Sequence, residues 1–299
     1  MKEKLTRCPV CEKGPLSDFL EVKDHFLSKE NFIIQSCDTC GFRFVNPRPP
    51  ADEIGAYYQS DEYISHGVVK QDLISKIYRK VRVFSIRNKF NIVRSLVPSG
   101  NILDIGCGTG EFLACCRTGN FKVQGIEPSE KAREFAISVN GISVSEKLDG
   151  AMLKPGTFTC ITMWHVLEHV HELDLTMDTI KSLLAPGGVF IVAVPNSNSW
   201  DASRYKGFWA AYDVPRHLYH FTNETMRVLA NRKGFTILKT IPQKLDAYYV
   251  TMLSEKYLAG RTNYVKMMIY GFWSNFKAKT GGKGHSSIIF VLSPGKPQF

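Results

Sequence analysis

The stretch Ile102–Phe112, ILDIGCGTGEF, joins an acidic residue to three glycines at alternate positions. The apolar run predicts a buried strand, and Gly106, Gly108 and Gly110 predict a tight turn whose backbone can approach a ligand that side chains would block. Open α/β sheets bind ligands at the carboxyl ends of their strands. The stretch therefore predicts a binding loop that begins with Asp104.

The glycine spacing indicates which kind of ligand this loop takes. A dinucleotide-binding turn needs its third glycine at position 111, but the residue there is Glu111, whose carboxylate would repel a pyrophosphate. Glu127, at the predicted tip of the next strand, can accept hydrogen bonds from both hydroxyls of a ribose. Asp104 can attract a cationic amino acid moiety. S-adenosylmethionine, a nucleoside joined to an amino acid without phosphate, meets both demands.

Two cysteine pairs near the N-terminus have the spacing of metal ligands. Cys8 and Cys11 form one C-x₂-C knuckle, and Cys37 and Cys40 form the other. The interval between the pairs is slightly longer than the common spacing, yet four thiolates in two knuckles are the strong form of the zinc signal. We expect a structural zinc ion that holds residues 1–50 together as a zinc-ribbon module.

Length and composition are those of a globular protein with room for one α/β domain and a small module, because the chain has 299 residues, of which 44% are hydrophobic and 22% charged. No apolar segment of the kind found in signal peptides precedes the first cysteine pair, and the longest purely apolar run, Val189–Val194, is too short to span a membrane. We expect a cytoplasmic protein without a transmembrane segment, whose other cysteines are small buried hydrophobes.

Strands and helices alternate after a turn at residues 98–100. Strands are predicted at 101–105, 122–126, 143–145, 160–163, 189–194, 235–241 and 287–292, and helices at 111–118, 129–140, 171–184 and 224–233. This order predicts an α/β fold, a Rossmann-like doubly wound sheet of six parallel strands and one antiparallel strand. The expected organisation is a zinc ribbon at 1–50, a basic helical connector at 51–97 and an α/β domain at 98–299, with a helical insertion near 244–285.

Four segments of this chain occur in the order of a known family's motifs: ILDIGCGTG, GIEPS, TCITMWHVLEHV and LLAPGGVFIVAVPN. In that order they resemble the successive motifs of the class I S-adenosylmethionine-dependent methyltransferases. The resemblance covers roughly residues 101–292. CGFRFVNPRP, followed by a tyrosine-rich segment, is similar to the zinc-ribbon start of a branch of these enzymes that includes deoxysugar C-methyltransferases.

The resemblance implies a role for each residue of the loop. The backbone at Gly106, Cys107, Gly108 and Gly110 would line the cofactor, with Asp104 near its methionyl amino group. Glu127 would bind the ribose, and Met163 and Trp164, at the end of the fourth strand, would flank the sulfonium.

Histidines are the candidates for activating the methyl acceptor, because a hydroxyl or a carbon acid must lose a proton to a base. His165 follows the fourth strand directly and is expected closest to the methyl group, and His169 shares its face if this turn is helical. His169 could equally order the loop. His217 follows Arg216 inside a long loop, where Arg216 could pair with a phosphate or carboxylate of the acceptor.

A metal site is the rival use of the same segment. HVLEHV resembles segments of ubiquinone-pathway and small-RNA 2′-O-methyltransferases in which paired glutamates and a histidine hold a divalent ion. Glu168 and His169 match that pattern, but His165 stands where the first glutamate would be. Magnesium prefers oxygen ligands, so this substitution argues against it.

A basic segment precedes the glycine loop. Leu73, Ile77, Val81, Phe84, Phe90, Val93 and Val97 recur at mostly three- and four-residue steps, which predicts one or two amphipathic helices. The basic residues between them are Lys70, Lys76, Arg79, Lys80, Arg82, Arg87, Lys89 and Arg94. This stripe is either a solvated helix face or a contact surface for RNA, an acidic membrane or a phosphorylated substrate.

We expect a methyltransferase that acts on a small or lipid-linked acceptor, such as a sugar or a quinone-like or polyketide-like hydroxyl. Residues 264–276, YVKMMIYGFWSNF, could build an adaptable apolar pocket or pack as an amphipathic helix on the sheet. A peripheral membrane contact through Trp273 and Phe276 is a weaker reading of the same residues. The alternatives are an RNA methyltransferase that binds through the zinc ribbon and the basic stripe, and a non-catalytic cofactor-binding scaffold.

Overall fold

A computed structural model describes residues 2–58, 73–148, 153–281 and 283–295, and for residues 73–79 it describes the backbone alone. Its centre is a seven-stranded sheet. In spatial order the strands are β10 (Phe235–Pro242), β11 (Ser287–Pro294), β8 (Leu184–Pro195), β7 (Phe158–Trp164), β4 (Asn101–Ile105), β5 (Lys122–Ile126) and β6 (Ser143–Ser145). Only β11 among these seven runs antiparallel to its neighbours, so the predicted six-plus-one Rossmann-like sheet is confirmed.

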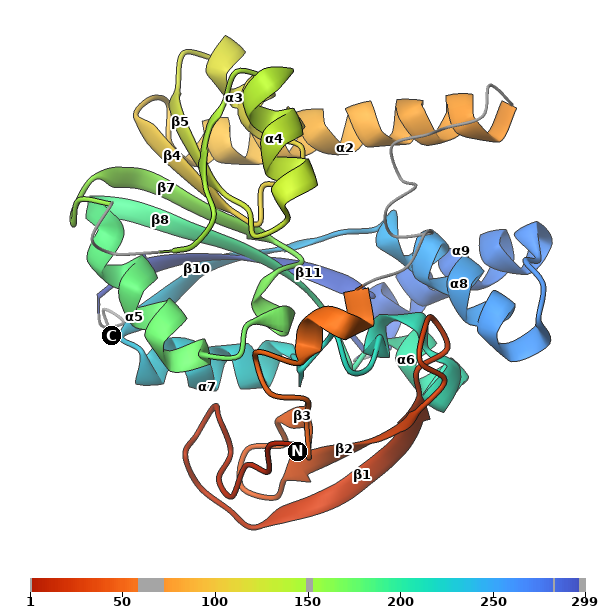
Figure 1. The fold of residues 1–299 in the computed structure, drawn as a ribbon. Coiled ribbons are helices and arrows are strands. Elements are labelled where there is room, and N and C mark those ends of the chain that lie inside the picture. Colours follow the sequence, from red (N-terminus) through yellow and green to blue (C-terminus); the bar gives the residue numbers. More distant parts are fainter. Residues whose placement is uncertain (1, 59–72, 149–152, 282, 296–299) are drawn as a thin grey trace.

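Helices cover both faces of this sheet and give three layers (Figure 1). One face carries α2 (Leu73–Leu96), α3 (Glu111–Thr118) and α4 (Glu130–Ser138), and the other carries α5 (Leu173–Leu183) and α7 (Asn223–Arg232). Each face has its own apolar core, with Phe112 and Cys116 in one and Met177 and Leu229 in the other. The β–α alternation therefore brings the carboxyl ends of β4, β5 and β7 to one edge, beside the glycine loop.

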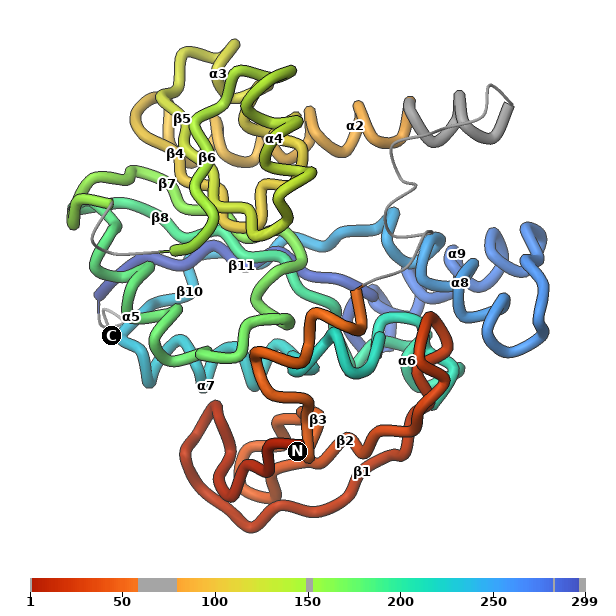
Figure 2. Tube along the Cα trace, in the orientation of Figure 1, coloured from red at the N-terminus to blue at the C-terminus, as the bar shows by residue number. Residues whose placement is uncertain are grey.

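The cysteine pairs belong to a second, four-stranded antiparallel sheet. Its strands in order are β1 (Leu16–Lys23), β2 (Asn31–Cys37), β3 (Arg43–Val45) and β9 (Tyr219–His220). The last strand comes from the long loop after β8, and Phe42 contacts both Tyr219 and Phe221. The N-terminal sheet and the loop around β9 thus share one core. Figure 2 shows the N-terminal strands below the large sheet.

Helix α2 differs from the predicted amphipathic pattern. Val93 and Val97 are buried as expected, but Val81 and Phe84 are exposed. The helix projects beyond the sheet towards its N-terminal end, so these residues have no layer to pack against (Figure 1). Lys70 and Asp72 lie outside the described residues.

The predicted insertion is a helical hairpin of α8 (Asp246–Ala259) and α9 (Tyr264–Thr280), which packs with α6 (Trp200–Tyr205) at one side of the molecule (Figure 1). Short 3₁₀ turns occur at Ile54–Tyr58, Leu167–His169, Lys206–Phe208 and Ala210–Tyr212. Within α9 only Gly271 and Ser274 are buried, so its large apolar side chains face solvent rather than an enclosed pocket. Among the described residues, no helix combines the length and apolarity needed to cross a membrane.

Candidate functional site

The glycine loop leaves β4 in a backbone conformation that glycine allows. Gly106, Gly108 and Gly110 have φ values of 75°, 55° and 76°. A Cβ atom added at Gly108 would meet nothing within 4 Å, whereas one at Gly106 would lie 2.4 Å from Cγ2 of Val166. The loop is therefore open to a ligand at Gly108, and at Gly106 it is pressed against the segment after β7.

Asp104 lies in the sheet at the start of this loop and is fully buried. Its Oδ1 accepts a hydrogen bond of 2.6 Å from the Thr162 hydroxyl, on the residue that faces it in register on β7. Burial raises the pKa of Asp104 to about 7, although Thr162 and the charge of Lys89 act in the opposite direction. The Asp104 carboxylate is thus fixed in position, and an ion pair with a cationic ligand would offset the free-energy cost of its desolvation.

Lys89 was not predicted as a site residue, because it belongs to the basic segment rather than to a motif. Its Nζ lies 4.8 Å from the ring centroid of Trp164, and burial lowers its pKa while Asp104 and Asp246 raise it. A half-buried ammonium and a buried carboxylate therefore lie near the glycine loop. This pair suits the carboxylate and the amino group of a zwitterionic amino acid.

Glu127 stands at the tip of β5, and its orientation is fixed by the backbone. Its Oε2 accepts a hydrogen bond from the N–H of Gly108, and its Oε1 accepts one from the N–H of Ser129, both at 2.8 Å. Each carboxylate oxygen keeps a second lone pair that a hydroxyl donor could use. The tip of β5 thus offers an ordered acceptor directly beside the open glycine.

The remaining predicted cofactor residues, Cys107, Met163 and Trp164, are all buried. Trp164 packs edge-on against Phe112 and lies under Lys89. Met163 belongs to one apolar core, and Cys107 and Trp164 belong to the other. None of the three side chains is therefore exposed beside the glycine loop.

His165 follows β7 and lies between two carboxylates. Its Nε2 is 3.2 Å from Oδ2 of Asp246, and its Nδ1 is 3.5 Å from Oε1 of Glu168. Burial alone would lower the pKa of His165, but its ion pairs with Asp246 and Glu168 raise it to about 10. His165 is therefore protonated at neutral pH and cannot accept a proton, contrary to the expectation that it is the foremost base.

Beside it, Glu168, His169 and His217 form a cluster in which Glu168 is buried and the two histidines are half-buried. Their ligating atoms lie within 4.8 Å of one another, and the two imidazole rings meet edge to face with centroids 4.6 Å apart. Neither carboxylate oxygen of Glu168 has a hydrogen-bond partner in the described structure, although the nearby histidines lower its pKa against the effect of burial. The sequence did not place His217 here, because the contact joins residues about fifty positions apart in the chain.

Backbone carbonyls lie beside Nδ1 of both histidines in this cluster. Nδ1 of His169 lies 2.9 Å from the carbonyl oxygen of Arg216 and 2.9 Å from the hydroxyl of Tyr58, and Nδ1 of His217 lies 2.8 Å from the carbonyl oxygen of Ala211. A carbonyl only accepts, so Nδ1 of His217 carries a hydrogen and donates it to Ala211. Burial and His217 lower the pKa of His169 to about 4, so His169 is neutral at physiological pH.

Arg216 does not face an acceptor site, contrary to the prediction. Its guanidinium is buried and pairs with Asp24 at 3.0 Å and with Asp213 at 2.6 Å. Asp24 follows β1, so this pair ties the N-terminal sheet to the loop that carries His217. Arg216 is a structural link between the two sheets.

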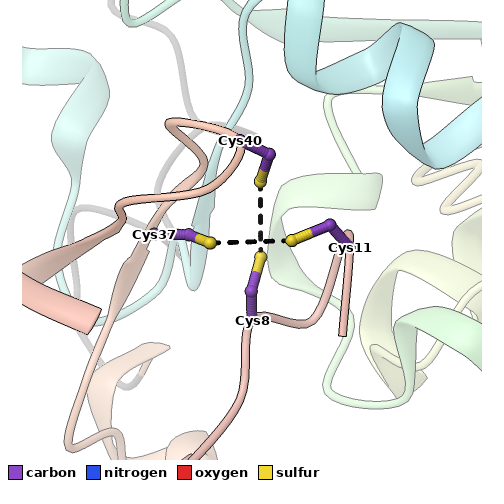
Figure 3. Close-up of side chains that lie close together, drawn as sticks. All are labelled: Cys8, Cys11, Cys37 and Cys40. Atoms are coloured by element: carbon purple, nitrogen blue, oxygen red, sulfur yellow. Dashed lines mark hydrogen bonds between the residues drawn. The ribbon is translucent and has the colours of Figure 1, made fainter. Parts of the chain in front are cut away.

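The four cysteines of the N-terminal pairs converge on one point (Figure 3). Sγ of Cys8 lies 3.6 Å from Sγ of Cys40, and the same distance separates Cys11 from Cys37. Four sulfurs about 2.3 Å from a tetrahedral zinc ion would be about 3.8 Å apart. The cluster therefore fits a closed zinc site, with no position left open for a substrate.

Comparisons with known proteins identify methyltransferases as the proteins that this chain resembles. A family model described as a methyltransferase domain matches residues 77–240. The ubiquinone biosynthesis O-methyltransferase of Rhizobium etli is 34% identical over 129 residues, which are 41% of this chain and 51% of that protein. The enzyme of the same name from Thiobacillus denitrificans is 30% identical over 121 residues, which are 38% of this chain and 52% of that protein.

This chain thus spans about half the length of the curated relatives that it matches. A solved structure from Galdieria sulphuraria, assigned as a sarcosine dimethylglycine methyltransferase, has a TM-score of 0.51 at 13% identity. It covers 75% of this chain and 89% of that one, and at this identity it shows the shared fold alone.

Proposed function

Because this chain belongs to the class I S-adenosylmethionine-dependent methyltransferases, we propose that it methylates a hydroxyl group of a small or lipid-linked acceptor. The observation that supports this proposal is the cluster of Glu168, His169 and His217 beside the glycine loop. Val166, which contacts Gly106, joins the cluster to the loop, so a bound donor and an activating group would meet there. The ubiquinone-pathway relatives are named as O-methyltransferases, which favours a hydroxyl over carbon or nitrogen.

The donor would be bound by the residues at the ends of β4 and β5. Asp104 would pair with the amino group of the donor, Lys89 with its carboxylate and Glu127 with its ribose. The open space beside the backbone of Gly108 would let the donor lie against the loop. S-adenosylmethionine supplies a methyl group on a sulfonium, from which an in-line nucleophile can take it. The protein's task is then to align the acceptor oxygen and to exclude water.

Removal of the acceptor proton falls to His217 in this proposal. Its Nδ1–H is engaged by Ala211, so Nε2 can accept the proton of a hydroxyl placed in the cluster. His165, already protonated, instead balances the charges of Glu168 and Asp246. Neutral His169 would orient the hydroxyl together with Glu168, whose two oxygens accept no hydrogen bond in the described structure.

The same three groups could hold a divalent ion. One carboxylate and two imidazoles suit zinc better than magnesium, which agrees with the objection to magnesium raised by the sequence. The metal content of the purified protein separates the two uses. A single zinc ion per chain, accounted for by the cysteines, favours a free histidine base, whereas a second ion would place a metal in the cluster.

RNA as the acceptor is less well supported, because part of the basic stripe is already engaged. Arg82 pairs with Glu111 at 2.7 Å, and Nζ of Lys89 lies over the ring of Trp164. Lys80, Arg87 and Arg94 remain exposed on α2.

We propose in addition that the cysteine cluster holds zinc and that the protein works in the reducing cytoplasm, where thiolates stay free of disulfides.

The experiment that tests this proposal is transfer of radiolabelled methyl groups from S-adenosylmethionine into a cell extract. RNA, protein, lipid and small metabolites are then counted separately. Label in the lipid or metabolite fraction, on an oxygen atom, is the expected result. Label in RNA would overturn the proposed acceptor. In that case the affinity of the protein for RNA should fall by orders of magnitude between about 50 and 200 mM salt.

Affinity for S-adenosylmethionine should depend on pH through Asp104. The pKa of this carboxyl is about 7 in the free protein, so it is largely neutral below that pH and attracts a cation only above it. We expect the dissociation constant to fall by roughly tenfold per pH unit below pH 7 as the pH rises, and to level off above it. Calorimetric titration from acid to neutral pH measures this, and Asp104→Asn should bind weakly at every pH. A dissociation constant independent of pH in the wild type would contradict this role for Asp104.

A further inference from the structure

Helix α9 presents an apolar face that nothing in the described structure covers. Seven large apolar side chains on it are between 41% and 69% exposed: Tyr264, Val265, Met268, Ile269, Phe272, Trp273 and Phe276. At about 100° per residue these positions occupy half of the helix circumference. The opposite side, with Gly271 and Ser274, is the one that packs on the protein. We name these seven side chains the α9 apolar face.

Positively charged residues predominate along this hairpin. After Glu255, the helices and their connection carry Lys256, Arg261, Lys266, Lys277 and Lys279 and no acidic residue. Glu255 is itself buried and is paired with Lys266 at 3.1 Å. Lys277 lies 5.3 Å from the ring centroid of Trp273, so a cation borders the aromatic end of the face.

We propose that the α9 apolar face binds the surface of an anionic membrane. Exposed aromatic and aliphatic side chains on one half of a helix, with lysines at its edge, are the features that allow a helix to lie in the interfacial layer of a bilayer. The charge complementarity selects an anionic lipid surface rather than an acidic or neutral partner. The α8–α9 hairpin also carries Asp246, whose carboxylate contacts His165, so a bound membrane would lie next to the proposed active site.

Vesicle flotation of the full-length protein tests this surface. Vesicles of phosphatidylcholine alone are compared with vesicles of equal parts phosphatidylcholine and phosphatidylglycerol, at low and at high salt. We expect binding to the anionic vesicles only, and weaker binding at high salt. Lys277→Gln and Lys279→Gln should each reduce the partition coefficient about fivefold.

The apolar part is tested with the double variant Ile269→Ser and Phe272→Ser. Each side chain is more than half exposed, so the variant should fold and bind S-adenosylmethionine as the wild type does, while vesicle partitioning falls at least about tenfold. Leu175→Ser on α5 is the matched control, because Leu175 is 63% exposed on another part of the molecule. It should leave partitioning unchanged.

Two results would overturn the proposal. The first is equal binding of the wild type to both kinds of vesicle, or binding to neither. The second is a dimeric wild type and a monomeric double variant that bind lipid equally. The α9 apolar face would then be a contact between two copies of the chain. Because donor binding is measured on the same samples, failure of the proposed methyl transfer would not be confused with either result.

Discussion

Replacing Cys37 with serine is expected to release the zinc ion and to unfold the four-stranded sheet. Cys37 is fully buried at the end of β2, and its sulfur lies 3.6 Å from that of Cys11. Zinc binding to such clusters contributes about 10 kcal/mol or more of folding free energy, because the site does not exist in the unfolded chain. A serine hydroxyl is a poor zinc ligand, so most of this contribution would be lost.

The measurement is zinc content together with thermal unfolding. The variant should contain much less than one zinc ion per chain, and its first unfolding transition should move down by about 10 °C or more, since about 1 kcal/mol corresponds to several degrees in a small unit. Cys115→Ser is the control, because Cys115 is half-buried on α3, away from the cluster. A Cys37→Ser protein that keeps its zinc and its transition would show that Cys37 is not a zinc ligand, and a wild-type protein purified without zinc would show that the cluster is not a zinc site.

The same substitution should impair methyl transfer more than donor binding. Strand β9 completes the four-stranded sheet, and Arg216, one residue before His217, pairs with Asp24 from the N-terminal part. The glycine loop, in contrast, is built on β4 and β5 and has no such link. Loss of zinc should therefore disorder the loop of His217 while the donor site persists.

The donor side of the site was predictable because its residues are close in sequence. The strand before Asp104, the glycines and Glu127 lie within one β–α–β unit, so local patterns predicted both their structure and their proximity. β4, β5, β6 and α3 have the predicted bounds. Such elements are determined by strand periodicity and by glycine positions.

The acceptor side was not predictable in the same way. His217 meets Glu168, and Arg216 meets Asp24, through contacts between distant segments that no local pattern encodes. Lys89 was assigned to a basic surface, although its Nζ lies over the ring of Trp164 at the end of β7. The exposure of the α9 apolar face likewise depends on which side of the helix the protein covers, and an amphipathic pattern alone does not decide this.

Replacing His217 with alanine should lower kcat by about 10²–10⁴-fold, the range found when a positioned general base is removed. The dissociation constant of S-adenosylmethionine should stay unchanged, because the side chain lies in the cluster with Glu168 and His169 and not at the glycine loop. Single-turnover methyl transfer and calorimetric donor binding measure the two quantities. His285→Ala is the control, since this half-buried histidine pairs with Asn275 rather than with the cluster.

Added imidazole distinguishes the ways in which the His217→Ala protein could fail. If His217 is the base, free imidazole can enter the space left by the ring and should restore part of kcat without changing donor affinity. A loss that imidazole does not restore, accompanied by loss of a second metal ion, would instead make His217 a metal ligand. If kcat is unchanged, acceptor activation does not occur in this cluster. The non-catalytic scaffold would account for the chain only if, with the wild-type protein, no fraction of the extract accepts a methyl group.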